Sequence, residues 1–280
     1  MRASYPLQSG KMLPEPQVPF PVSSDHRVRP DLVRLDPPAF RLDSEYPRYL
    51  RAKREQFFLP WTQLEASWAD AAAVQESLAY LAKRLADEHP EHHQTHFGAL
   101  GEEVTDGAMA LALSVQEDLV LMKGPLLEAL WVCFPSNWNP HDKIGRSFAE
   151  IHTPVPHSEK LQAAQANVAK AMSEKGPFVR YVWGLTFDPS LSAHPDRPKV
   201  LEGQQVYFRT ERQTTLPLPE LGRSWFLIRV YIAPVEQVAN SPARRAALRE
   251  AMRTMPEAHK AYKQGTVMAY ERLEHDGFFD

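Results

Sequence analysis

The sequence predicts an α+β fold, in which a single antiparallel sheet is flanked by helices. Five short segments rich in β-branched and aromatic residues, and bounded by Gly or Pro, predict its strands. They cover residues 119–123, 129–134, 179–187, 205–213 and 224–232. A helical segment between the second and third strands agrees with helices that pack on the sheet. Because no internal repeat or linker divides the chain, we expect a single domain.

Helices are predicted where apolar residues recur every three or four positions. Residues 44–58 show this spacing, and residues 70–88 carry a stripe of Val74, Leu78, Leu81 and Leu85. Residues 157–174 form the predicted helix between the strands. Near the C-terminus, Ser241–Pro242 has the residue types of an N-cap and a first helical position, and the helices that follow extend to about residue 273.

Proline is concentrated at the N-terminus. Eight of the 25 prolines lie in the first 40 residues, which end at Pro37–Pro38. Proline fixes φ and lacks an amide donor, so this segment forms neither a regular helix nor a central strand. We predict a Pro-rich arm at 1–40 and a domain at 41–280. The apolar residues that predict packing of the arm's second half on this domain are Phe20, Val22, Leu32, Val33, Leu35 and Phe40.

Composition excludes several classes of protein. A net charge of −3 argues against a nucleic-acid scaffold, and no run of 18 apolar residues predicts a membrane-spanning helix. The N-terminal residues lack the apolar run of a secretory signal, so we expect a cytoplasmic protein. Cys133 is the only cysteine, which excludes an internal disulfide, a cysteine-ligated iron–sulfur cluster, a zinc ribbon and haem attachment through CxxCH.

Familiar nucleotide, zinc-protease and serine-hydrolase motifs are absent from the sequence. Four histidines gather at His89, His92, His93 and His96. His92 and His96 would share one face of a helix, which suits a metal site. Pro90 and Gly98 bound the segment, however, and no cysteine or carboxylate pair accompanies it, so we favour a solvated loop.

His152 is the strongest candidate for a metal ligand. It precedes Thr153-Pro154-Val155-Pro156, and two prolines restrict the backbone on either side of Val155. We expect extended backbone after His152 and a fixed ring direction, as an axial metal ligand requires. The alternative is a partly buried histidine that hydrogen-bonds to the backbone.

Charged residues interrupt the predicted strand at 205–213. Side chains alternate along a strand, so Arg209, Glu211 and Gln213 share one face, whereas Thr210 and Arg212 share the other. One interpretation is a structural ion pair between Arg209 and Glu211. The other is an arginine directed at an anionic or polarised ligand, with a carboxylate beside it.

Five ordered runs resemble the haem-dependent oxidative N-demethylase family, which includes the haem subunit of bacterial dimethylamine monooxygenase. These runs are VQEDLVLM (115–122), CFPSNW (133–138), KIGRSFAEIHTPVP (143–156), FRTERQT (208–214) and FLIRVYI (226–232). The likeness extends from about residue 28 to residue 273. One departure is Val182, where the resemblance predicts asparagine before Trp183.

The resemblance implies a PAS-like fold with a five-stranded antiparallel sheet, and a b-type haem. It makes His152 the proximal iron ligand and the ERQ motif the source of distal polar groups, namely Glu211 with Arg209 or Arg212. We also consider Lys143, Arg146 and Arg180 as partners of the haem propionates; otherwise they are solvated surface charges.

The implied activity is oxidative N-demethylation of a small secondary amine, such as dimethylamine, with O₂ and release of formaldehyde. The chain has no nucleotide-binding motif, so electrons from NAD(P)H would arrive through a separate flavin/iron–sulfur reductase or a ferredoxin-like subunit, in a hetero-oligomer. The alternative is a non-catalytic PAS-type haem sensor or haem-binding protein. The charged pair favours the enzyme, because a gas sensor needs a hydrogen-bond donor and no carboxylate.

Overall fold

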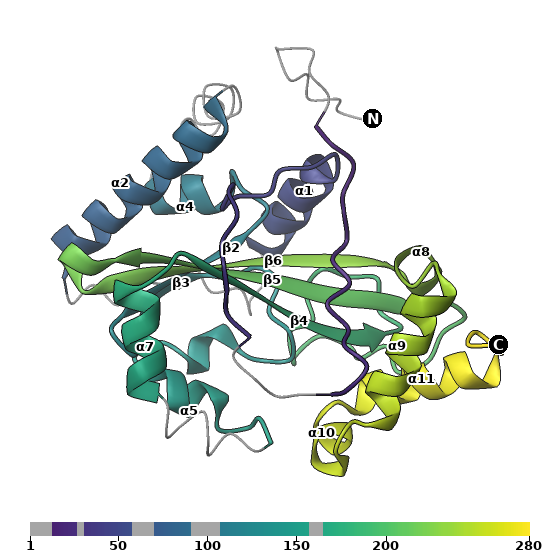
Figure 1. Cartoon of the computed structure of the whole chain (residues 1–280). Helices are drawn as coiled ribbons and strands as arrows, with labels where there is room; N and C mark the ends of the chain where they lie inside the picture. Colours follow the sequence, from purple (N-terminus) through teal and green to yellow (C-terminus); the bar gives the residue numbers. More distant parts are fainter. Residues whose placement is uncertain (1–12, 27–30, 58–69, 91–106, 157–164) are drawn as a thin grey trace.

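The computed structural model describes residues 13–26, 31–57, 70–90, 107–156 and 165–280, and its centre is an antiparallel sheet of six strands (Figure 1). These are β1 (Val33–Arg34), β2 (Asp118–Lys123), β3 (Leu126–Trp131), β4 (Phe178–Thr186), β5 (Tyr207–Leu218) and β6 (Arg223–Pro234), in the order β1-β4-β5-β6-β2-β3. All five predicted strands are confirmed, but the expectation of a five-stranded sheet is wrong. The additional strand, β1, is a two-residue segment of the predicted arm that pairs with the start of β4.

Helices cover the sheet on both faces (Figure 1). They are α1 (Tyr46–Phe57), α2 (Ala71–Glu88), α4 (Gly107–Ala112), α5 (Phe148–His152), α7 (Gln165–Glu174), α8 (Val235–Val238), α9 (Pro242–Arg253), α10 (Glu257–Tyr262) and α11 (Gln264–His275), with 3₁₀ turns η1 (Pro140–Asp142) and η2 (Pro219–Leu221). The helices predicted at 44–58 and 70–88 are confirmed. The N-cap predicted at Ser241 is also confirmed, since its side chain accepts the Arg244 N–H. Of the helix predicted at 157–174, residues 157–164 lie outside the described residues.

The register of the central strands determines which side chains share a face. Glu211 of β5 lies opposite Val182 of β4 and Val230 of β6, so the odd-numbered residues of β5 share a face with these two. We call this side the α5 face, because α5 and α7 lie on it (Figure 1) and Ile151 of α5 belongs to the same apolar cluster as Val230. The opposite side, the α2 face, is covered by α2 and α4 and holds the buried Trp131 and Trp225.

The second half of the arm packs on the body, as predicted. Phe40 is fully buried, and the Glu88 carboxylate of α2 accepts the backbone N–H groups of Ala39 and Phe40. Val33 is an exception to the prediction, because 63% of it is exposed at the edge of the sheet. The arm is therefore attached to the body through backbone groups and through apolar side chains that include two aromatic rings, Phe40 and Phe20, the second of which packs on Phe208.

His26, farther back in the arm, lies against the α9–α10 region. Its backbone N–H donates to Thr254 Oγ1 at 3.0 Å, and its ring centroid is 5.3 Å from that of His259. Burial, together with the charges of Lys263 and His259, lowers the pKa of His26 to about 4. His26 is thus neutral in the folded protein at neutral pH.

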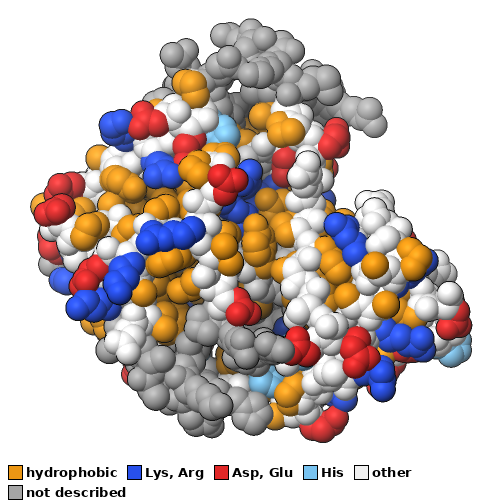
Figure 2. Space-filling view, viewed as in Figure 1, with side chains coloured by type: hydrophobic (Ala, Val, Ile, Leu, Met, Phe, Trp, Pro, Cys, Tyr) orange, Lys and Arg blue, Asp and Glu red, His pale blue; other side chains and the backbone are white. Residues whose placement is uncertain are grey.

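On the face of the molecule shown in Figure 2, acidic and basic side chains are interspersed with apolar ones. This distribution agrees with the net charge of −3. Among the described residues, no helix is both long enough and apolar enough to cross a lipid bilayer.

A buried ion pair joins α1 to the centre of the sheet. Lys53 Nζ lies 3.5 Å from Asp118 Oδ1 and donates to the carbonyl of Ala112, and neither charged side chain is exposed. Asp118 in turn accepts the backbone N–H groups of Cys133 and Phe134, at 3.0 and 2.7 Å. The carboxylate therefore fixes the chain just beyond the end of β3.

We predict that Lys53→Met destabilises the fold by about 3–5 kcal/mol, because it leaves Asp118 buried without its counter-charge. Urea unfolding measures this change. Lys83→Met is the matched control, since Lys83 forms an exposed pair with Asp87 and should have little effect. Equal effects of the two substitutions would contradict the assigned role of Lys53.

Acid should destabilise the protein through His26. The unfolded chain binds a proton at His26 near pH 6.5, whereas the folded chain does so only near pH 4, so stability falls as the pH decreases through this window. In His26→Gln, the loss of stability between about pH 7 and about pH 4.5 should be smaller than in the wild type. The exposed His275→Gln serves as the control, and an unchanged pH dependence in His26→Gln would refute the prediction.

Candidate functional site

His152 is the last residue of α5, a short helix that its own sequence starts. Ser147 and Glu150 form a capping box, in which each side chain accepts the other residue's backbone N–H. The expectation of extended backbone after His152 is wrong, because Thr153 is in the right-handed helical region. The turn closes when the Val155 N–H donates to the His152 carbonyl at 2.9 Å.

The orientation of the His152 ring is nevertheless fixed. Its Nδ1 lies 2.7 Å from the carbonyl oxygen of Phe148, and because a carbonyl can only accept, Nδ1 carries the proton. Burial lowers the pKa of His152, and the charges of Arg180 and Lys143 lower it further, although the Phe148 hydrogen bond opposes them. The ring is therefore a neutral imidazole whose Nε2 carries the lone pair that a metal ion would require.

Arg180 of β4 lies on the α5 face, opposite Gln213. Its Nε is buried and has no hydrogen-bond partner in the described part of the chain. Burial lowers the pKa of Arg180, an effect that the carboxylate of Glu211 opposes. A buried donor without a partner is costly in a protein, so this guanidinium is suited to binding an anionic group that the described residues do not supply.

Lys143 and Arg146, the other predicted propionate partners, lie in the segment between β3 and α5. Lys143 follows η1, is half-buried and acts electrostatically on His152. Arg146 is exposed, and its charge acts on Glu150 instead. The structure thus brings Lys143 and Arg180 near His152, but gives Arg146 no such relation.

Glu211 lies at the centre of the polar group on the α5 face. One carboxylate oxygen accepts a short hydrogen bond from the Ser136 hydroxyl, and the other accepts Gln213 Nε2 at 2.8 Å. Val182, the departure from the expected asparagine, is its cross-strand neighbour on β4. The negative charge of Glu211 acts on three buried or half-buried cations, namely Arg180, Arg209 and Lys263.

Arg209 is held by neighbouring groups through all three guanidinium nitrogens. Nε and Nη2 donate to Ser136 Oγ at 3.1 and 2.8 Å, and Nη1 donates to the carbonyls of Leu191 at 2.7 Å and Ser190 at 3.3 Å. Ser136 therefore bridges Arg209 and Glu211. This arrangement agrees with the structural interpretation of the pair, although the contact passes through a hydroxyl.

Arg212 does not join this group. As the alternation predicts, it lies on the α2 face, where it donates to the carbonyls of Ala39 at 2.7 Å and Pro38 at 3.1 Å. Of the two arginines predicted for the distal site, only Arg209 is on the same face as Glu211. Arg212 instead fastens the arm to the sheet.

Two members of the polar group were not predicted from the sequence. Ser136 lies in the CFPSNW run, but no local pattern indicates its contact with a strand far along the chain. Lys263 lies between α10 and α11, and its ammonium donates to the Trp183 carbonyl at 2.8 Å. Both contacts arise from tertiary packing, so no spacing rule identifies them.

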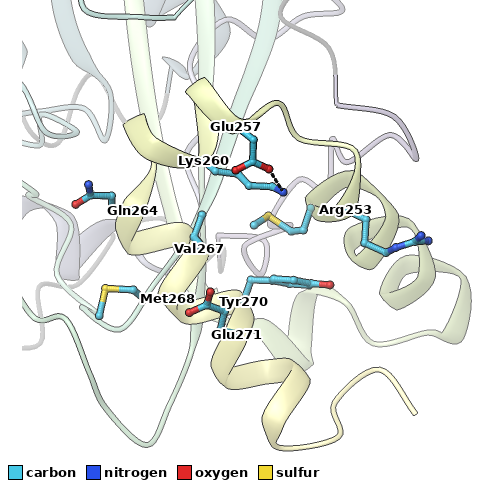
Figure 3. A pocket seen from close by; sticks show the side chains of 9 residues that line it. Arg253, Glu257, Lys260, Gln264, Val267, Met268, Tyr270 and Glu271 are labelled. Atoms are coloured by element: carbon cyan, nitrogen blue, oxygen red, sulfur yellow. Dashed lines mark hydrogen bonds and ion pairs between the residues drawn. The ribbon is translucent and has the colours of Figure 1, made fainter.

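Two cavities lie away from these residues. One, of about 740 Å³, is a groove between α9, α10 and α11 (Figure 3). The other, of about 1150 Å³, lies under the arm on the α2 face and is bordered by Arg212 and Tyr231. Neither is lined by His152 or Glu211.

Of the four histidines at 89–96, only His89 lies within the described residues. His89 Nε2 lies 3.0 Å from the Phe40 carbonyl, whereas His92, His93 and His96 lie outside the described residues. Within the described ranges, no three His, Cys, Asp or Glu residues gather as a metal-binding group. His152 is therefore considered as a single protein ligand.

Comparison with known protein families agrees with the resemblance found in the sequence. The model of the family described as haem-dependent oxidative N-demethylase, alpha subunit-like, matches residues 36–271. The match includes α5 with His152, β4 with Arg180, β5 with Glu211 and the segment that carries Lys263. The chain belongs to the haem-dependent oxidative N-demethylase alpha subunit-like family.

Proposed function

We propose that this chain is the haem-binding subunit of an oxygenase that removes a methyl group from a small secondary amine such as dimethylamine. The observation that carries the proposal is the His152 ring, which is half-buried, neutral and oriented through Nδ1 so that Nε2 carries the lone pair. Family membership supports haem dependence and oxidative N-demethylation. The balanced reaction converts dimethylamine, O₂, two electrons and two protons into methylamine, formaldehyde and water.

The residues around His152 fit a non-covalently held haem b. His152 would bind the iron, and Arg180, with its unpartnered buried Nε, and the half-buried Lys143 would pair with the propionates. Ile144, Ile151 and Trp138 are partly buried and pack in the apolar cluster that contains Val230. They would give the haem macrocycle an apolar environment. When bound, haem supplies the iron at which O₂ is activated.

We assign substrate binding to Glu211. Its carboxylate is oriented by Ser136 and Gln213, which are neutral donors, and as an acceptor it can bind the N–H groups of a protonated amine. Arg209 then acts by fixing Ser136 and the chain around Leu191 rather than by touching the substrate. In this proposal Arg212 has only a structural role.

A sensor would have little use for this arrangement. Recognition of a bound gas requires one hydrogen-bond donor, whereas a carboxylate that Ser136 and Gln213 hold in place is suited to binding an amine and handling protons. We further propose that electrons come from a separate reductase or ferredoxin-like subunit, because the sequence has no nucleotide-binding motif and only one cysteine. The family description, alpha subunit-like, supports an assembly with other subunits.

We expect the wild-type protein to bind added haem and to show a Soret band that is lost in His152→Ala. The matched control is His141→Ala, an exposed histidine in the neighbouring turn, which should bind haem as the wild type does. Absorption spectra recorded before and after addition of dithionite measure both. A normal Soret band in His152→Ala would remove His152 as the ligand, and a wild type that binds no haem would remove the proposed function.

Glu211→Gln should retain haem and lose formaldehyde production from dimethylamine by about 10²-fold or more, because the amide cannot bind the ammonium or take a proton. Formaldehyde is measured with a chemical electron donor, so that the identity of the natural reductase does not matter. Glu202→Gln, at an exposed position, is the control. Equal rates for Glu211→Gln and the control would exclude Glu211 from the reaction.

A further inference from the structure

Phe148 is the first residue of α5 and lies one turn before His152. Residues four apart in a helix are neighbours on its surface, so these two side chains can meet. Their ring centroids are 4.2 Å apart, and the ring planes are inclined by 38°. The Phe148 carbonyl is also the group that accepts the His152 Nδ1–H, at 2.7 Å. One residue thus contacts the imidazole twice, through its backbone and through its ring.

The backbone around Phe148 is tied to the hairpin of β2 and β3. The Phe148 N–H donates to the Pro125 carbonyl at 2.8 Å. Just upstream, the Leu127 N–H donates to the Arg146 carbonyl at 3.0 Å, and the Gly145 N–H donates to the Leu127 carbonyl at 2.9 Å. Gly145 has a φ of 76°, which glycine adopts without strain. Phe148 is therefore attached to the sheet at the point where α5 begins.

The two contacts restrain different aspects of the imidazole. Rotation about the Cβ–Cγ bond of a histidine is broad and roughly two-fold, so an unrestrained ring exchanges its two nitrogens. The hydrogen bond selects the orientation in which Nδ1 faces the Phe148 carbonyl. The Phe148 ring packs beside the imidazole and occupies space through which it would turn. A ring that is oriented in advance loses less entropy when it binds a metal ion.

We infer that Phe148 is a positioning residue for the haem ligand, because its carbonyl and its ring together hold the His152 imidazole in one orientation. The inference rests on the proposed function, since it takes His152 as the ligand of the iron. The partner of the second ring nitrogen fixes the tautomer of a metal-binding histidine. Here that partner is a neutral carbonyl, which orients the ring and leaves the imidazole neutral. The aromatic ring of Phe148 adds the restraint that a carbonyl alone does not supply.

The first test measures the ring orientation without haem and without activity. The full chain is labelled with ¹⁵N in its histidines, and long-range ¹H–¹⁵N spectra distinguish the two neutral tautomers; the His152 signal is the one that His152→Gln removes. The wild type should show the Nδ1–H tautomer. Phe148→Leu should show a mixture with the Nε2–H tautomer, because the imidazole is no longer held against the carbonyl. Full retention of the Nδ1–H tautomer in Phe148→Leu would overturn the inference.

Two further variants serve as controls of this experiment. Phe148→Tyr keeps an aromatic ring and should give the wild-type His152 signal. Phe278→Leu makes the same change as Phe148→Leu at another half-buried ring, which packs against Phe279 near the C-terminus with 5.1 Å between the ring centroids. It should also leave the His152 signal unchanged. A mixture of tautomers in either control would overturn the inference.

The second test measures the consequence for haem. Phe148→Leu should bind haem about tenfold more weakly in a Soret titration, at the lower end of what outer partners of a metal ligand contribute. The iron–histidine stretching band of its ferrous form should be shifted and broadened in resonance Raman spectra, and Phe148→Tyr should restore both properties. If melting curves show that Phe148→Leu does not fold, Phe148→Met, which also lacks a ring, takes its place. A folded variant without the ring that keeps the wild-type affinity and band would overturn the inference.

The two tests separate this inference from the function proposed above. If His152→Ala keeps the Soret band and the tautomer of His152 still depends on Phe148, the proposed function fails and the positioning of His152 by Phe148 stands. If the Soret band depends on His152 and neither the tautomer nor the haem spectra respond to Phe148→Leu, Phe148 fails as a positioning residue and the proposed function stands.

Discussion

β5 directs charged side chains to both faces of the sheet, and each of them needs a counter-charge or hydrogen bonds. The rest of the structure depends on this constraint. A buried charge is tolerated only with a counter-charge or with hydrogen bonds, and β5 directs charged residues to both sides. Arg212 is satisfied by carbonyls of the arm, which therefore lies against the α2 face. Arg209 is satisfied by Ser136 and by the carbonyl of Leu191, which brings those two segments together on the α5 face. The strand thus organises segments that are distant in the sequence.

The same network connects the core to the candidate site. Asp118, paired with Lys53, holds the backbone at Cys133 and Phe134, and two residues later Ser136 contacts both Arg209 and Glu211. A change in the buried pair would therefore be expected to reach the carboxylate through a short stretch of backbone. Glu211 accepts a hydrogen bond from a neutral donor on each of its two oxygens, and these two bonds hold the carboxylate in one orientation.

The parts of the fold that follow from local rules could be predicted from the sequence. The helix starts at Asp70 and Ser241 follow capping chemistry, and the distribution of Arg209, Glu211 and Arg212 over two faces follows strand alternation. β1 was missed because a two-residue strand in a Pro-rich arm has no pattern of its own. The prolines at 154 and 156 predict extended backbone after His152, but Ser147 and Glu150 have the spacing of a capping box and start a helix whose turn continues through Thr153.

The site could be predicted only in part, for a related reason. His152 and Glu211 lie in recognisable runs, and the resemblance of those runs to one family is confirmed by the match over residues 36–271. Ser136 contacts Glu211 from just beyond the end of β3, and Lys263 contacts the Trp183 carbonyl of β4, and such contacts depend on the folded chain. The roles given to these residues in catalysis remain predictions.

The central claim is that haem and amine meet on the α5 face, between His152 and Glu211. A crystal structure of the haem-reconstituted protein with dimethylamine tests it most directly. We expect iron bound to His152 Nε2, a propionate on Arg180 and the amine nitrogen within hydrogen-bond distance of Glu211. Haem bound elsewhere, for example in the cavity under the arm beside Arg212, would contradict it.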